Sequence, residues 1–163
     1  MRVHVLQHVP FEGLGSIAPW LQAHAASVSW TRFFDGDPLP DPAGFDLVIA
    51  LGGPMSVNDA LPWIEPACAL LRDAVDARVP VIGHCLGGQL LARALGATVA
   101  RAAQTEIGWI DVDAAPGAGA WFGGRPRFTA FQWHYDAFEL PRGATPNLSV
   151  ILGGAGTSLE QLV

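Results

Sequence analysis

Residues 80–96, PVIGHCLGGQLLARALG, constrain the fold of this chain more than any other segment. The surrounding pattern predicts a strand at Val79–Gly83, a turn that holds a cysteine between two glycines, and a helix over Gly88–Leu95. A strand that passes into a helix through such a turn is typical of α/β proteins with a parallel sheet. Ligands of these sheets bind at the carboxyl ends of the strands, so the turn would present Cys85 to a binding crevice.

The segments before this turn also alternate between strand and helix patterns. Short apolar or alternating runs predict strands at Val3–Leu6, Ser27–Arg32 and Asp46–Leu51, and helical spacing predicts helices at Ile17–Ala26 and Trp63–Ala77. The run at Asp46–Leu51 is almost entirely apolar, which indicates a strand buried on both faces. Such alternation with short connections predicts a parallel sheet covered by helices on both faces.

The second half of the chain predicts strands with no long helix between them, at Ala97–Ala103, Ile107–Val112, Arg127–Phe131 and Leu148–Leu152. The Ala-, Gly- and Pro-rich stretch 114–124 predicts a connection with a short helix at most. We expect antiparallel strands at one edge of the sheet. The predicted fold class is therefore a three-layer, doubly wound α/β protein of flavodoxin-like type, with a mostly parallel sheet, a nucleophile elbow and antiparallel edge strands.

Composition narrows the function classes. The 163 residues suit a single domain over residues 1–163, and a 50% hydrophobic, 15% charged composition predicts a compact interior. The net charge is −6 and all nine basic residues are arginines that form no cluster, so we expect no binding to nucleic acid. Polar residues interrupt the N-terminal segment MRVHVLQHVPFEG, so we expect neither a signal peptide nor a membrane span there, and a cytoplasmic location.

The spacing Gly-x-Cys-x-Gly fits a reactive cysteine. A sharp strand-to-helix turn strains the nucleophile's backbone and brings neighbouring chain close, so side chains at positions 83 and 87 would clash. The helix that follows points its first amides at the sulfur, which predicts a lowered pKa for Cys85 and an oxyanion donor at Leu86 N–H. A second donor is expected from Gly52-Gly53. We expect both cysteines to be free thiols, with Cys68 buried on the apolar stripe of its helix.

Four motifs in unbroken order carry a family resemblance: DLVIALGGPMSV, PVIGHCLGGQLLARALGA, EIGW and FQWHYDAFELP. Together they resemble the class I glutamine amidotransferases, in particular stand-alone proteins similar to the amidotransferase domain of GMP synthase. The resemblance implies that a cysteine attacks the side-chain amide of glutamine, forms a thioester and releases ammonia. It implies no cofactor and no metal. A separate synthetase could be the partner that uses the ammonia.

The resemblance also assigns roles to residues. Cys85 would be the nucleophile, and Gly53 and Leu86 would supply the oxyanion hole. The substrate-binding residues would be Gly52, Gly53, Gln89, Trp133, His134 and Tyr135. The last three match a segment whose backbone grips the amino-acid end of glutamine, and the competing interpretation of this run is an aromatic core cluster.

The family's base and its orienting acid come from a His-Pro-Glu motif that this sequence does not contain. His84 adjoins Cys85 but should point away from the sulfur, and His134 matches a substrate-binding position. His8, with Glu12 nearby, is the remaining candidate for a substitute base. Two further histidines are expected to belong to the scaffold, His4 and His24.

The C-terminal residues do not supply the missing acid, because Ser158 stands where a histidine should precede Glu160 by two positions. We expect the resemblance to end near residue 145, through truncation or a frameshift of the natural gene or through a designed shortening. We also expect the glutaminase activity of this chain to be impaired.

Other functions stay open on the same fold. A γ-glutamyl or other amide hydrolase would pass the acyl group to water without a synthetase. A non-catalytic binding or regulatory protein would keep the pocket without the triad. A redox or stress protein would use the elbow cysteine, but this function leaves the WHYD and EIGW segments unexplained.

Overall fold

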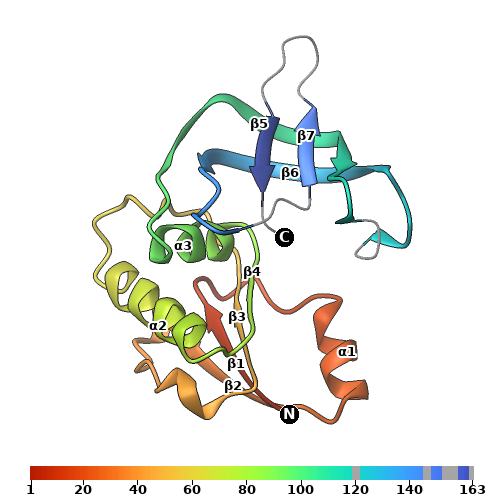
Figure 1. Ribbon diagram of the computed structural model, residues 1–163. Helices are drawn as coiled ribbons and strands as arrows, with labels where there is room; N and C mark the ends of the chain where they lie inside the picture. The colour runs from red at the N-terminus through yellow and green to blue at the C-terminus, as the bar shows by residue number, and fades with distance from the viewer. Residues whose placement is uncertain (119–121, 145–147, 152–157, 162–163) are drawn as a thin grey trace. The chain divides into compact units, whose positions relative to one another are not determined.

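Figure 1 shows the computed structural model of the chain, which describes residues 1–118, 122–144, 148–151 and 158–161. The chain divides into two compact units, Met1–Ala94 and Leu95–Val163. Each unit contains a four-stranded sheet. The expectation of a single domain over residues 1–163 stays a prediction.

The first unit is built on a parallel sheet. Its strand order is β2 (Ser27–Arg32), β1 (Arg2–Gln7), β3 (Leu47–Ala50) and β4 (Val81–Gly83). All four residues of β3 are buried, as expected for an apolar strand with a neighbour on each side and helices above and below. This unit confirms the predicted α/β class with its parallel sheet.

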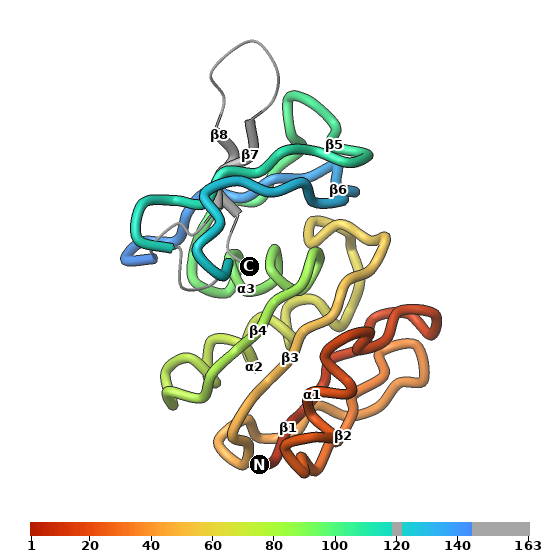
Figure 2. Tube along the Cα trace, turned by 90° about the vertical axis from the view of Figure 1, so that its right-hand side faces the viewer, coloured from red at the N-terminus to blue at the C-terminus, as the bar shows by residue number. Residues whose placement is uncertain are grey.

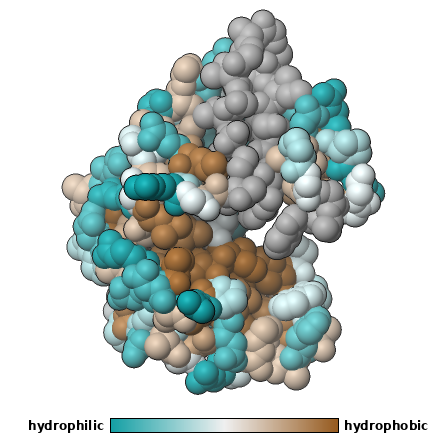
Figure 3. Space-filling model, viewed as in Figure 1, coloured by the Kyte–Doolittle hydropathy of each residue, from teal (hydrophilic) through white to brown (hydrophobic). Residues whose placement is uncertain are grey.

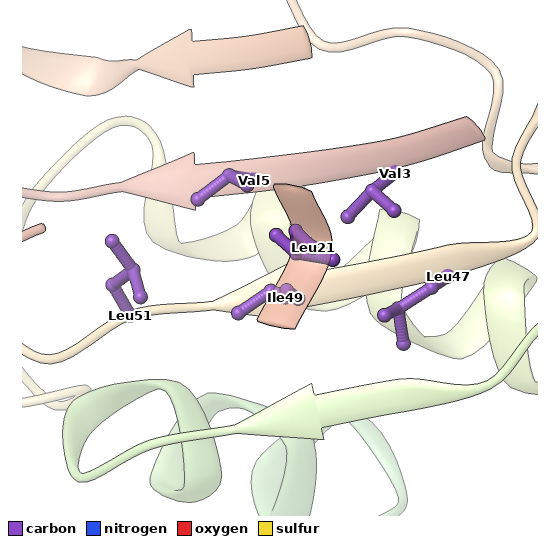
Figure 4. Packing of buried hydrophobic residues seen from close by; sticks show 6 residues of the cluster. All are labelled: Val3, Val5, Leu21, Leu47, Ile49 and Leu51. Carbon is purple, nitrogen blue, oxygen red and sulfur yellow. The ribbon is translucent and has the colours of Figure 1, made fainter. Parts of the chain in front are cut away.

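Helices cover both faces of this sheet. Leu21 of α1 (Ile17–Ala23) packs against alternate residues of β1 and β3, as Figure 4 shows for Val5 and Ile49. Ala50 points to the opposite face from Ile49 and meets Gly87 of α3 (Leu86–Ala94). The helix α2 (Ile64–Asp76) packs against α3. In Figure 2, which is turned by 90°, α1 lies in front of the strands.

Two short 3₁₀ helices, η1 (Phe33–Asp35) and η2 (Pro42–Gly44), lie between β2 and β3 in the chain. In Figure 3 hydrophobic side chains gather over α3 and the β4 edge of the parallel sheet, and Ile82 of β4 is 40% exposed. Among the helices of the described residues, none combines the length and apolar character needed to cross a membrane.

The second unit is an antiparallel sheet with the strand order β6 (Arg127–Phe138), β5 (Val99–Ala114), β7 (Leu148–Ile151) and β8 (Ser158–Gln161). The predicted antiparallel strands are present, but they form this second sheet and do not extend the parallel one. The reason is that β6 and β7 occupy the two edges of β5, so its backbone groups are already paired.

The long strands differ from the predicted ones in their bounds. β5 joins the predicted strands at 97–103 and 107–112 through a register shift between Arg101 and Glu106. β6 continues past Phe131 and includes the whole WHY run. The predicted end of a strand at Leu152 and part of the predicted 114–124 connection lie outside the described residues.

The two faces of the β5–β6 ribbon are unlike. Val112 is buried, and the side chains that pack against it are Ile110, Phe122, Phe128 and Ala130. The alternate residues point the other way, as the period of a strand requires. They include large exposed apolar side chains, namely Ile107, Trp109, Phe131 and Trp133.

Candidate active site

Cys85 lies at the turn between β4 and α3, in a left-handed backbone conformation with φ of 52°. Such a φ strains a residue that has a side chain. Three backbone hydrogen bonds hold the turn. His84 N–H donates to the Ala50 carbonyl at 2.9 Å, Gly87 N–H donates to the His84 carbonyl at 2.9 Å, and Gln89 N–H donates to the Cys85 carbonyl at 3.1 Å. Cys85 therefore stands at an elbow that β3 and α3 both support.

The glycines of the elbow are there because the backbone leaves no room for a side chain. A Cβ atom at Gly87 would fall on the carbonyl group of Ala50 in β3. A Cβ atom at Gly83 would lie 2.7 Å from both the carbonyl oxygen of Gly87 and Cα of Gly88. These contacts are the clashes that the Gly-x-Cys-x-Gly spacing predicts.

Two backbone amides act on the Cys85 thiol, those of Leu86 and Gly53, and hydrogen bonding from each lowers its pKa. The net change is nevertheless in the other direction. Burial of the sulfur is the largest effect and raises the pKa of Cys85, and the negative charge of Glu12 raises it further. The prediction of a lowered pKa is therefore wrong, because desolvation outweighs the amides at the start of α3.

Gly52 is the meeting point of three side chains with reactive groups. A Cβ atom there would fall on the carboxylate oxygen Oε2 of Glu12 and would lie 3.4 Å from both Cys85 Cβ and His84 Nδ1. Sequence reasoning placed Glu12 with His8 and missed its position beside the cysteine. No local signal could have shown it, because the contact joins the loop after β1 to the loop after β3.

His8 follows β1 and is 3% exposed. Its Nδ1 lies 3.2 Å from the Gly52 carbonyl oxygen, and its ring stacks on Phe33 and packs against Trp63. Burial lowers the pKa of His8 to about 4, although hydrogen bonds with the backbone of Gly52 and Leu51 partly offset this effect. An imidazole with this pKa is a weak proton acceptor, which argues against the suggested role as substitute base.

In the second unit, His134 of β6 faces Glu106 of β5 across the ribbon, with His134 Nδ1 3.3 Å from Glu106 Oε2. Glu106 is buried, and burial raises the pKa of its carboxyl group. Sequence reasoning quoted EIGW as a motif but gave Glu106 no role. Pairing the two motifs as neighbouring strands would have been the signal.

Trp133 and Tyr135 lie on the face of β6 opposite to His134 and are 62% and 42% exposed. The guanidinium of Arg101 lies 4.6 Å from the centre of the Tyr135 ring. The interpretation of the WHY run as an aromatic core cluster therefore does not hold.

The candidate residues divide between the two units. The first unit brings together Gly52, Gly53, Cys85 and Leu86, and Gln89 is buried in α3 one turn beyond the cysteine. The second unit carries the WHY run. Both cysteines are free, as expected, and the buried Cys68 donates a hydrogen bond to the carbonyl of Leu90 at 3.6 Å. In the part of the chain that the structure describes, no three His, Cys, Asp or Glu side chains gather to hold a metal ion.

The parallel sheet and the strained cysteine between β4 and α3 define a class: α/β proteins with a cysteine at a nucleophile elbow. A thiol in this position, with two amides beside it, can attack a carbonyl carbon while the amides bind the oxyanion.

The model of the family "Glutamine amidotransferase class-I" matches residues 24–153. The chain therefore belongs to the class I glutamine amidotransferase family, which confirms the resemblance carried by the four motifs.

Individual relatives agree with this assignment. A glutamine amidotransferase-like protein of Salmonella typhimurium is 39% identical over 114 residues, which are 66% of this chain and 48% of that protein. A glutamine-hydrolysing GMP synthase of Aeropyrum pernix is 34% identical over 126 residues, 77% of this chain and 23% of that protein. The chain thus spans about half or less of the length of these curated relatives.

A solved structure is also similar. The crystal structure of a glutamine amidotransferase from Methylobacillus flagellatus has 41% sequence identity and a TM-score of 0.87, over 91% of this chain and 61% of that chain. This likeness confirms the α/β fold class.

Proposed function

We propose that this chain hydrolyses the side-chain amide of glutamine through a thioester on Cys85. The thiolate attacks the amide carbon, and the carbonyl oxygen becomes an oxyanion. The carbon–nitrogen bond then breaks, and ammonia leaves with the proton that the thiol has lost. Water cleaves the γ-glutamyl thioester, which releases glutamate and restores the thiol, so that glutamine and water become glutamate and ammonia.

The elbow geometry is the observation that carries this proposal. Cys85 is held at a positive φ, and the amides of Leu86 and Gly53 act on its sulfur. In the reaction these two N–H groups bind the oxyanion. Gln89 and the backbone at Gly52 contact the substrate, and Trp133, His134 and Tyr135 bind the amino-acid end of glutamine.

We propose further that the 163-residue chain turns over slowly. The raised pKa of Cys85 keeps most of the thiol protonated near neutral pH, and the sequence contains no His-Pro-Glu motif to act as base and acid. The likeness to part of a GMP synthase supports a separate synthetase as the partner that uses the ammonia.

Ammonia release from glutamine by the purified chain tests the proposal, with Cys85→Ala as the inactive variant. Cys68→Ala is the matched control, because it removes the other free thiol from the core of the same unit. We expect glutamine-dependent ammonia that is lost in C85A and kept in C68A. Equal release by C85A would contradict the proposal. Faster cleavage of γ-glutamyl peptides than of glutamine would favour the amide hydrolase.

A further inference from the structure

The hydrogen bond between His8 and Gly52 determines which nitrogen of His8 carries the proton. His8 Nδ1 lies 3.2 Å from the Gly52 carbonyl oxygen, which can only accept a hydrogen bond. A neutral ring bonded in this way must therefore be protonated at Nδ1. His8 Nε2 is buried and, within the described part of the chain, has no hydrogen-bond partner.

The Gly52 carbonyl belongs to the same planar peptide unit as the Gly53 N–H, and in a trans peptide the two groups point in opposite directions. Fixing the carbonyl oxygen therefore fixes the direction of the Gly53 N–H. This peptide needs such a restraint, because it joins two glycines, whose backbone rotates more freely than that of other residues. On its other side lies the elbow: a Cβ at Gly52 would be 3.4 Å from Cys85 Cβ, and one at Gly53 would be 3.0 Å from Leu86 Cδ2.

Aromatic packing holds the His8 ring in the orientation that this bond needs. Its centre lies 5.2 Å from that of Phe33, with 11° between the ring planes, and 5.1 Å from that of Trp63. Phe33 and Trp63 also stack on each other, with centres 4.8 Å apart. The ring is thus confined by η1 and by the residue that precedes α2, and it has little freedom to release the Gly52 carbonyl.

We propose that His8 is a positioning residue that aims the Gly53 amide at the oxyanion formed on Cys85. The inference rests on the proposed function, because the oxyanion arises from the amide that Cys85 attacks. In this role His8 transfers no proton and needs only its Nδ1–H group.

Two substitutions separate the hydrogen bond from the packing. His8→Phe keeps an aromatic ring between Phe33 and Trp63 but removes the donor. His8→Asn loses the ring but can place an amide N–H near the position of Nδ1. His4→Phe is the control, because His4 is a buried histidine of β1 that stacks on Phe45 and bonds to Ser29 and Thr31.

The probe is the diazoketone analogue of glutamine, in which a diazomethyl group replaces the amide nitrogen. The Cys85 sulfur bonds to the diazo carbon, the thiol proton goes to that carbon and dinitrogen leaves, while the ketone oxygen occupies the oxyanion site. Iodoacetamide labelling of the same thiol is the reference, because that displacement forms no oxyanion.

We expect H8F to slow analogue labelling about 10- to 100-fold relative to iodoacetamide labelling, and H8N and H4F to stay within about threefold of the wild type. A packing role for His8 predicts the reverse order of H8F and H8N, and that result would overturn the proposal. So would equal slowing of both reagents in H8F. Labelling of the wild type that glutamine does not block would contradict glutamine as the substrate, whereas the ratio between variants would still report on His8.

Nitrogen NMR of the wild-type protein gives a second test that needs no variant to fold. The proposal requires the neutral tautomer with a proton on Nδ1 and none on Nε2. A ring protonated at Nε2 could not donate to Gly52 and would overturn the proposal.

Discussion

The two units hold their candidate site residues in different ways. In the first unit, Cys85 and its neighbours are fixed by main-chain contacts so close that Gly83 and Gly87 admit no side chain. In the second unit, the candidates lie on a strand whose residues point alternately to a packed and an exposed face. The first unit should therefore be intolerant of small changes in backbone space, whereas the second should tolerate the loss of large side chains from its exposed face.

Gly87→Ala should have the largest effect, because its Cβ would meet the Ala50 carbonyl and force β3 and α3 apart. We expect it to lower the free energy of unfolding by about 3 kcal/mol or more. Gly44→Ala is the control, because nothing lies within 4 Å of the added Cβ. Chemical denaturation of both variants measures the difference. A Gly87→Ala protein as stable as Gly44→Ala would show that the elbow is not tightly packed.

Lowering the pH should destabilise the first unit through His8. The pKa of His8 is about 4 in the folded protein against an ordinary value of 6.5, so between these values the unfolded chain binds a proton that the folded chain does not. The free energy of unfolding should fall by about 3 kcal/mol as the pH is lowered through this window. Denaturation of the wild type and of His8→Asn at several pH values should show that the variant lacks this slope. His24→Asn, at an exposed position of the same unit, should keep it.

Cys85→Gly should be more stable than Cys85→Ala by about 1 kcal/mol, because glycine adopts the φ of 52° without strain. On the exposed surface of α2 the order should reverse, with Arg72→Gly less stable than Arg72→Ala. Thermal unfolding of the four variants measures both differences. The same order at both positions would mean that Cys85 stores no backbone strain.

Glu12→Gln should lower the pKa of Cys85, because it removes a negative charge that disfavours the thiolate. Below that pKa, iodoacetamide alkylation of Cys85 should become about two- to fivefold faster at a fixed pH. Asp76→Asn, which removes a charge from the end of α2, should leave the rate unchanged. Slower alkylation in Glu12→Gln would contradict the position of its carboxylate beside the cysteine.

In the second unit, Trp133→Ala should cost less than about 0.5 kcal/mol, because the side chain is largely exposed. Phe128→Ala on the packed face should cost about 2 kcal/mol, because the ring packs against Val112 and Phe122. If Trp133 binds glutamine, its loss should also raise the glutamine concentration that protects Cys85 from the diazoketone. Equal destabilisation by the two changes would remove the distinction between the faces of the ribbon.

Local patterns sufficed to predict much of the first unit. Apolar runs and helical spacing predicted β1, β3 and α2 because each buries a regular set of residues, and the spacing around Cys85 predicted the clashes at Gly83 and Gly87. The second unit was harder to predict. The residues AAQTE that join the halves of β5 have no strand-like alternation, and only pairing with β6 keeps them extended.

The properties of the candidate site depended on contacts distant in the sequence. The raised pKa of Cys85 follows from burial and from Glu12, neither of which appears in the GHCLGG motif. The Glu106–His134 pair requires the register of two strands, and the bond from His8 to Gly52 joins residues 44 positions apart. Sequence spacing located the reactive residue, whereas its electrostatic surroundings required the fold.

The mass of the acyl-enzyme is the most direct test of the account. The chain is mixed with glutamine, quenched in acid and digested, and the peptide that contains Cys85 is weighed. We expect it to carry a γ-glutamyl group, which adds the mass of glutamine less that of ammonia, and we expect no such group on the Cys68 peptide or in Cys85→Ala. An unmodified Cys85 at every time point, together with no release of ammonia, would contradict the central claim.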